Sequence, residues 1–173
     1  MIRNMVIGFG RFNPVTIGHE RIYNIINTNF PDDCEKYIIT TTTHDNKKNP
    51  LTVEQKLRYL NKAFPNVDIL VNYEGGLIGT LKQFESAEYL RIVCGEDRIK
   101  EFEERVRLYN HNLYEFTKID FVPVPRDQYQ ISGTKMRQFV KDGDFKKFEQ
   151  HCPTRFNKQD TIDMFNDLAK ALR

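Results

Sequence analysis

The sequence predicts an α/β fold in which helices cover a mostly parallel, five-stranded sheet. Short runs rich in β-branched and aromatic residues alternate along the chain with segments whose apolar residues recur at helical spacing. Strands that alternate with helices favour βαβ units, and right-handed crossovers between them give a doubly wound sandwich. The length of 173 residues suits one domain with a substantial core.

Five apolar runs predict the strands. The first run, Met-Val-Ile-Gly-Phe, is apolar throughout, as expected of a buried strand. We expect Pro123 and Pro125 to end the last strand, because proline cannot donate a ladder hydrogen bond. The predicted strands cover residues 5–9, 37–41, 68–71, 89–93 and 119–122.

The predicted helices lie between and after these strands. Thr52 and Gln55 form a capping box that opens a helix extending to about Ala63. The helices are expected over residues 18–28, 52–63, 80–84, 99–108, 132–141, 145–150 and 158–172. We expect residues 1–173 to form a single domain, with 153–173 as a C-terminal helical appendage.

Composition and charge argue against several classes of protein. The formal net charge of +2 is too small to indicate nucleic-acid or membrane binding by itself. Three cysteines far apart in the sequence fit a reducing compartment, and no pair of Cys or His residues has the spacing of structural zinc. No apolar stretch resembles a signal peptide or reaches transmembrane length. We therefore expect a soluble, cytoplasmic protein without nucleic-acid or membrane partners.

The segment that follows the first strand carries the strongest functional pattern. Glycines and a proline turn the chain from the strand into a helix that starts near Gly18 and His19. Ligands of doubly wound sheets bind outside the carboxyl ends of the strands, where a helix N-terminus offers backbone N–H groups to phosphate. Gly18 would allow close approach of the phosphate, while Thr16 and His19 would donate to the same oxygens. The residues expected to line this loop are Gly10, Arg11, Phe12, Asn13, Thr16, Gly18 and His19.

A second segment, after the last strand, repeats this logic. Ser132 and Thr134 can cap a helix, and Arg137 lies one turn further along. Two hydroxyls and a guanidinium at a helix N-terminus suit a triphosphate. The residues expected to bind here are Ile131, Ser132, Gly133, Thr134 and Arg137.

Together the two segments resemble the signatures of the nucleotidylyltransferase superfamily, whose His/Thr-x-Gly-His motif is shared with class I aminoacyl-tRNA synthetases. Gly10-Arg11-Phe12-x-Pro14 is similar to archaeal-type nicotinamide mononucleotide adenylyltransferases, whereas Thr16-Ile-Gly18-His19 is similar to phosphopantetheine adenylyltransferase. The second segment resembles Ile-Ser-Ser-Thr-x-x-Arg, with Gly133 in place of the second Ser. The resemblance covers residues from about 5 to 150 and implies a Rossmann-like sandwich.

Two shorter segments are weaker matches to the superfamily. Lys48 follows the second strand in a stretch that resembles the family segment meeting the phosphates; a solvated loop lysine is the alternative. Gly95, Asp97 and Arg98 follow the fourth strand and resemble the segment that holds ribose. A carboxylate can accept from ribose hydroxyls, but Asp97 could instead cap the following helix.

The resemblance implies adenylyl transfer from ATP to nicotinamide mononucleotide, with His19, Thr16, Arg137 and Lys48 as the catalytic residues and Mg²⁺ bound with the triphosphate. Transfer to phosphopantetheine, or cytidylyl transfer to a phospho-alcohol, is the alternative within the superfamily. A non-catalytic nucleotide-binding module is the alternative of another class, and an RNA-binding relative of the synthetases has less support. The expected partners are a nucleoside triphosphate and a small phosphorylated acceptor; the chain could also form a homo-oligomer.

Overall fold

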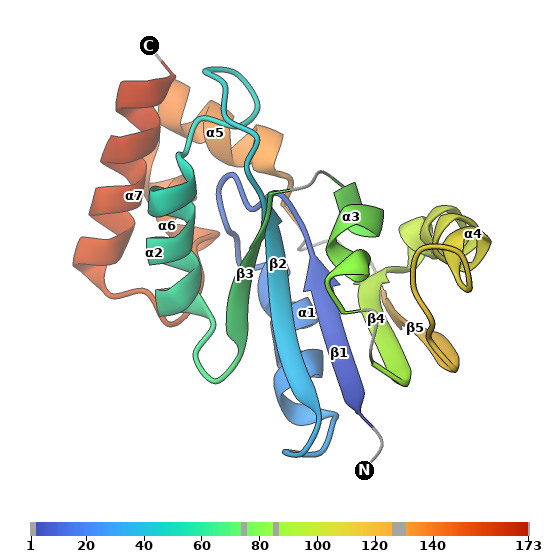
Figure 1. Ribbon diagram of the computed structural model, residues 1–173. Coiled ribbons are helices and arrows are strands. Elements are labelled where there is room, and N and C mark those ends of the chain that lie inside the picture. Colours follow the sequence, from blue (N-terminus) through green and yellow to red (C-terminus); the bar gives the residue numbers. More distant parts are fainter. Residues whose placement is uncertain (1–2, 74–75, 85–86, 126–130, 173) are drawn as a thin grey trace. The chain divides into compact units, whose positions relative to one another are not determined.

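The computed structural model describes residues 3–73, 76–84, 87–125 and 131–172 (Figure 1). These residues form two compact units, each assembled from three stretches of the chain. The first, here called the sheet unit, consists of Met1–Gly10, Ile22–Thr41 and Asn66–Asp127. The second, the helical unit, consists of Arg11–Arg21, Thr42–Pro65 and Gln128–Arg173.

The sheet unit contains a five-stranded sheet in the order β3-β2-β1-β4-β5, and every neighbouring pair is parallel (Figure 1). The central strand β1 pairs through Ile7 with Tyr37 on one side and Ile92 on the other. The strands are β1 (Asn4–Phe9), β2 (Glu35–Thr41), β3 (Asp68–Asn72), β4 (Tyr89–Gly95) and β5 (Lys118–Val124). An all-parallel sheet joined by helices confirms the predicted Rossmann-like fold.

Helices of the sheet unit follow the strands in sequence. They are α1 (His19–Thr28, whose first turn belongs to the helical unit), α3 (Gly76–Lys82), the short 3₁₀ helix η1 (Glu96–Arg98) and α4 (Ile99–Tyr109). A Cβ atom on Gly8 of β1 would lie 2.8 Å from Ile22 and 3.0 Å from Ile26. Glycine at this position therefore lets α1 pack directly onto the strand.

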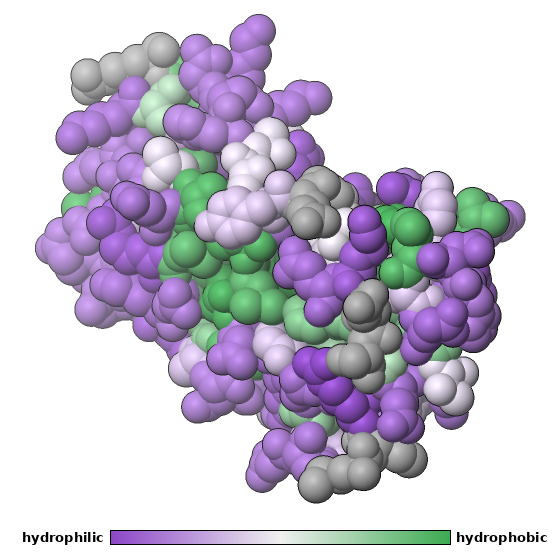
Figure 2. Space-filling model, viewed as in Figure 1, coloured by the Kyte–Doolittle hydropathy of each residue, from purple (hydrophilic) through white to green (hydrophobic). Residues whose placement is uncertain are grey.

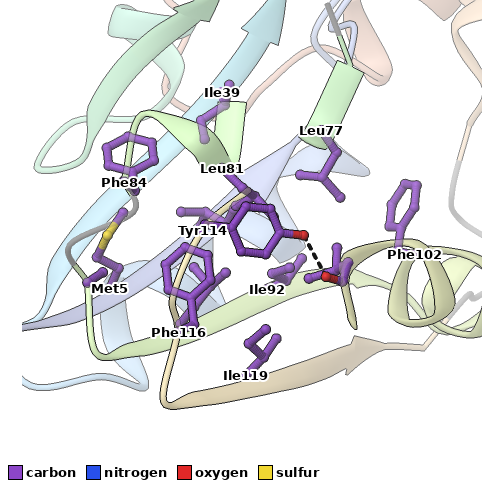
Figure 3. Close-up of a cluster of buried hydrophobic side chains, with 14 of the residues drawn as sticks. Met5, Ile39, Leu77, Leu81, Phe84, Ile92, Phe102, Tyr114, Phe116 and Ile119 are labelled. Atoms are coloured by element: carbon purple, nitrogen blue, oxygen red, sulfur yellow. Dashed lines mark hydrogen bonds between the residues drawn. The ribbon is translucent and has the colours of Figure 1, made fainter. Parts of the chain in front are cut away.

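A single apolar cluster fills one side of the sheet unit (Figure 3). Met5 and Ile92 contribute from the strands, Leu77 and Leu81 from α3, and Phe102 from α4. The hydroxyl of Tyr114, which is buried in the same cluster, donates to the backbone carbonyl of Val106 at 2.5 Å. The buried polar group is thereby satisfied, as a packed core requires.

The helical unit contains α2 (Val53–Ala63), α5 (Gly133–Lys141), α6 (Phe145–Gln150) and α7 (Lys158–Ala171). Thr52 and Gln55 form the predicted capping box at the start of α2. Polar contacts join α2 to α7: Lys62 pairs with Asp160, and Asp167 accepts from Arg58 at 2.7 Å and from the Tyr59 hydroxyl at 2.5 Å. The segment predicted as an appendage, residues 153–173, is therefore part of this unit's packing.

Two predictions are wrong in their reasoning: where α3 begins, and that Pro123 ends the last strand. The helix expected at 80–84 is α3, which begins at Gly76, because Leu77 and Leu81 are buried in the core and outweigh the low helix propensity of glycine. The strand expected to end before Pro123 continues to Val124. β5 is an edge strand, and proline is tolerated there because only one side of the strand is paired with a neighbour.

Hydrophilic residues cover most of the face drawn in Figure 2, in agreement with the mean hydropathy of −0.60. Within the part of the chain that the structure describes, no helix is both long enough and apolar enough to cross a bilayer.

Candidate functional site

Three loops of the helical unit meet at Asn13, whose side chain is buried. Its Oδ1 accepts from the Leu51 N–H at 2.8 Å, and its Nδ2 donates to the Leu51 carbonyl at 3.4 Å. Nη1 of Arg137 donates to the Asn13 backbone carbonyl at 2.8 Å. Asn13 thus joins the loop after β1, the loop before α2 and the first turns of α5. Its amide group, predicted to bind nucleotide, holds these loops together.

The ring of His19 is fixed in one tautomer. The backbone N–H of Thr16 donates to Nδ1 of His19 at 3.0 Å, so the proton of the neutral ring lies on Nε2. Phe12 packs edge-on against the imidazole, with ring centroids 4.8 Å apart. Burial lowers the pKa of His19 to about 4, which keeps the ring neutral near pH 7. His19 therefore offers a neutral N–H donor at the start of α1.

The turn before α1 uses most of its amide groups within the protein. Besides the Thr16 N–H, the Ile17 N–H donates to the His151 carbonyl at 2.8 Å and the His19 N–H to the Thr16 carbonyl at 3.1 Å. Among the described residues, the Gly18 N–H finds no acceptor. The sequence led us to expect several amides here to face a phosphate; the Gly18 N–H is available for this, whereas those of Thr16, Ile17 and His19 are used within the protein. Thr16 is buried with its Oγ1 3.3 Å from Nδ1 of His19, so it orients the imidazole; its donation to phosphate stays a prediction.

Three cationic side chains influence one another in the helical unit. Burial and then the positive charge of Arg11 lower the pKa of Arg137. The same two causes lower the pKa of Lys56, which is 1% exposed, to about 8. The Lys56 ammonium donates to the Arg11 carbonyl at 3.3 Å. Like charges that are gathered and partly desolvated repel one another, so a bound anion would stabilise this arrangement.

The first turn of α5 has the capped geometry expected of the second segment. Ser132 is the N-cap, and its Oγ accepts from the Lys135 N–H at 3.2 Å. The hydroxyl of Thr134 accepts from Nη2 of Arg137 at 3.2 Å. Ile131, which is half-buried, precedes the cap. A capped N-terminus followed by a hydrogen-bonded guanidinium is the arrangement expected of an anion site, and binding of the triphosphate here stays a prediction.

Lys48 lies in a loop organised by Asp45. The Asp45 carboxylate accepts from the backbone N–H groups of Lys47 at 2.8 Å, Lys48 at 2.7 Å and Asn49 at 3.2 Å. These hydrogen bonds, together with one from the Asn49 side chain, hold the pKa of Asp45 well below its usual range. The loop backbone is therefore fixed while the Lys48 side chain is exposed, and its contact with phosphate stays a prediction.

Four of the predicted site residues belong wholly to the sheet unit: Gly10, Gly95, Asp97 and Arg98. The Gly10 N–H donates to the Ile39 carbonyl at 3.0 Å and continues the sheet ladder. A Cβ atom on Gly95 would lie 2.8 Å from Oδ1 of Asp97, so glycine leaves room for this carboxylate. The N-cap of α4 is Arg98, without a side-chain hydrogen bond, so helix capping does not account for Asp97.

Lys56 and the backbone of Leu51 are site components that the sequence reasoning missed. Lys56 shares a helical face with Tyr59, Leu60 and Ala63, all of them buried. A lysine at the i position of an apolar i, i+3, i+4, i+7 stripe could have signalled a buried charge. The role of Leu51 carried no such signal, because only its backbone takes part.

Comparison with known families finds a match to the family described as cytidylyltransferase-like over residues 7–139, which is more than half of the chain. Among solved structures, TmcAL of Thermotoga maritima, crystallised with alpha-thio ATP, is 11% identical, with a TM-score of 0.59 over 95% of this chain and 55% of its own. A macrolide-efflux protein from Streptococcus pneumoniae is 16% identical, with a TM-score of 0.54 over 87% of this chain and 55% of its own.

These two likenesses concern the fold alone, and the chain spans about half the length of either protein. No curated protein sequence matches it significantly. The family match covers the candidate site as well as the fold, because residues 7–139 include both the loop around His19 and the first turns of α5. The chain therefore belongs to the cytidylyltransferase-like family of the nucleotidylyltransferase superfamily.

Proposed function

We propose that this protein transfers a nucleotidyl group from a nucleoside triphosphate to a small phosphorylated acceptor and releases pyrophosphate. The observation that carries the proposal is that Lys56 and Arg137 both contact the backbone of the segment that contains Arg11: Lys56 donates to the Arg11 carbonyl and Arg137 to the Asn13 carbonyl. The same unit holds His19 as a neutral donor. A polyanion is the ligand that such a surface binds best.

In the proposed reaction an acceptor phosphate oxygen attacks the α-phosphorus of the triphosphate. The bond from the α-phosphorus to the bridging oxygen breaks as the new bond forms, and its electron pair leaves with pyrophosphate. The enzyme forms no covalent intermediate and acts by positioning the two anions and neutralising the developing charge. Nε2–H of His19 donates to an oxygen that becomes more negative, while Arg137 and Arg11 bind the departing phosphates.

ATP as donor and nicotinamide mononucleotide as acceptor are the specific substrates that we propose. The support is the Gly10-Arg11-Phe12-x-Pro14 segment, which resembles archaeal-type nicotinamide mononucleotide adenylyltransferases, together with a fold shared with a protein solved with an ATP analogue. Cytidylyl transfer is the competing assignment, because the matching family is described as cytidylyltransferase-like.

Magnesium enters this scheme as part of the triphosphate substrate. Within the described residues, no group of three or more His, Cys, Asp or Glu side chains is placed to hold a metal ion. Mg²⁺ commonly binds through substrate phosphates and waters with few protein ligands, and we propose that arrangement here.

The test is a screen of pyrophosphate release, in which each of the four nucleoside triphosphates is paired with a panel of phosphorylated acceptors in the presence of Mg²⁺. We expect ATP with nicotinamide mononucleotide to give the fastest release. Faster release from CTP with a phospho-alcohol would replace the adenylyl assignment. Binding of a triphosphate without release from any pair would support a non-catalytic nucleotide-binding module.

A further inference from the structure

Gly133 is the first residue of α5 and lies beside the guanidinium of Arg137, so that a side chain at this position would meet the arginine. A Cβ atom on Gly133 would lie 2.9 Å from Nη1 of Arg137 and 3.6 Å from the carbonyl oxygen of Asn13. The shorter distance is one that real Cβ atoms do not reach, so the guanidinium would have to move. Any residue larger than glycine at 133 competes with Arg137 for this space.

The backbone gives no reason for glycine at this position. Gly76 and Gly143 have left-handed φ values, and Gly133 does not. The first position of a helix also gains from alanine, because glycine loses more conformational freedom on folding. The benefit of Gly133 therefore lies in the space that it leaves.

We infer that Gly133 is a positioning residue for the proposed nucleotidyl transfer: its missing side chain leaves the space in which Arg137 docks against the carbonyl of Asn13. The docked guanidinium donates from Nη1 to Asn13 and from Nη2 to Thr134. The Asn13 carbonyl is itself held in place by the pairing of the Asn13 side chain with Leu51. Arg137 is thereby fixed at both ends of its guanidinium before any ligand binds.

A docked guanidinium can still bind phosphate. Arginine has five N–H groups, and the contacts with Asn13 and Thr134 use two of them. Three remain for phosphate oxygens, and they are already oriented, so less conformational entropy is lost when the triphosphate binds. Gly133 thus contributes to rate through the orientation of Arg137, and this inference rests on the proposed function for its catalytic consequence.

The test compares Gly133→Ala and Gly133→Ser with the unaltered protein in three measurements. The first is the melting temperature, which we expect to be unchanged or higher in Gly133→Ala. The second is the rate at which the Arg137 guanidinium rotates, measured by ¹⁵N NMR without any ligand. The Arg137 signal is identified as the one that is missing from the spectrum of Arg137→Lys. We expect slow rotation in the unaltered protein and fast rotation in both Gly133 variants.

The third measurement is a double-mutant cycle for pyrophosphate release. Gly133→Ala should lower kcat about tenfold or more in the unaltered background and change nothing further in an Arg137→Ala background, because the glycine acts only through the arginine. An equal loss in both backgrounds, or normal turnover in Gly133→Ala, would overturn the inference. Where no substrate pair releases pyrophosphate, the proposed function fails, and the NMR comparison alone decides whether Gly133 docks Arg137: equal rotation in all proteins refutes it.

Discussion

The imidazole of His19 is held in a state that suits hydrogen-bond donation. Donation from the Thr16 backbone occupies Nδ1, and the edge-on contact with Phe12 limits rotation of the ring. Since burial lowers its pKa to about 4, the ring carries one proton, on Nε2, throughout the neutral range. A neutral donor that is already oriented can act on charge that develops in the transition state without reorganisation of the site.

We predict that His19→Ala lowers kcat for pyrophosphate release by about 10²–10³-fold, which is the usual cost of removing one such donor. The nucleotide KM should change far less, because the donor acts mainly on charge that appears as the leaving bond breaks. Steady-state kinetics with a melting curve test both points. Near-normal turnover would remove His19 from the mechanism, and loss of the folded state would give it a structural role instead.

The same environment predicts how stability depends on pH. The pKa of His19 is about 4 in the folded protein and 6.5 in an unfolded chain, so the unfolded state binds a proton first as the pH falls. The stabilisation is present above pH 6.5 and is lost as the pH falls toward 4. Because the ring is partly exposed, we expect a loss of about 2 kcal/mol, less than the full shift would give.

Urea titrations between pH 4 and 7 measure this loss as the difference in the free energy of unfolding between the unaltered protein and His19→Gln. Glutamine keeps an N–H donor but has no titration in this range, so other ionisable groups cancel in the difference. The difference should shift in favour of the variant below pH 6.5. A pH-independent difference would mean that the folded-state pKa of His19 is close to its ordinary value.

How far single residues were predictable depends on what carries their role. The sequence identified His19, Ser132, Thr134 and Arg137 as candidates because their side chains are polar and lie in the first turns of recognisable helices, and their roles stay predictions. Lys56 was missed, although it lies on the same helical face as the apolar residues Tyr59, Leu60 and Ala63, a pattern that signals burial. The pairing of Asn13 with a backbone 38 residues away is invisible in local pattern.

At the scale of the elements, the strands and most helices follow local sequence. Apolar runs and capping residues act over a few positions, so β1, β2 and α2 lie within two residues of prediction. The errors in α3 and β5 arose where long-range context overrides local preference. Burial of Leu77 and Leu81 sustains a helix that contains glycines, and the edge position of β5 tolerates Pro123.

The role of α7 is testable through its buried face. Leu168 is 0% exposed, so Leu168→Ala should destabilise the protein by about 2–5 kcal/mol through lost burial and a residual cavity. Denaturant unfolding of this variant beside an exposed control on the same helix, Lys170→Ala, provides the measurement. A loss below about 1 kcal/mol would mean that the packing of α7 contributes little to stability, as expected if residues 153–173 are an appendage.

For η1, the structure sharpens the test of Asp97. Because capping of α4 does not account for this carboxylate, Asp97→Ala should weaken nucleotide binding beyond any change in stability. Melting temperature and nucleotide affinity measured on one variant separate the two effects. Unchanged affinity would refute the ribose assignment, whatever happens to the melting temperature.

Across the whole molecule, the division into two units was not predictable from the sequence. The helical unit is built from three stretches that alternate along the chain with stretches of the sheet unit. In the sequence, no stretch of linker composition marks the boundaries. Sequence patterns report what a segment forms locally, and neither their composition nor their periodicity says which segments pack into one compact body.

Nucleotide binding should stabilise the whole protein by an amount that grows with the logarithm of the ratio of free nucleotide to its Kd. A ligand that binds only the folded state at 100 times its Kd adds about 2.7 kcal/mol. For a chain of this length each kcal/mol raises the melting temperature by about 2–4 °C, so we predict a shift of about 5–10 °C with MgATP at that concentration.

The shift should be larger than with MgGTP or MgUTP, and Arg137→Ala should reduce it, because the guanidinium is part of the proposed phosphate site. A larger shift with MgCTP would favour the cytidylyl assignment, and no shift with any triphosphate would contradict nucleotide binding altogether.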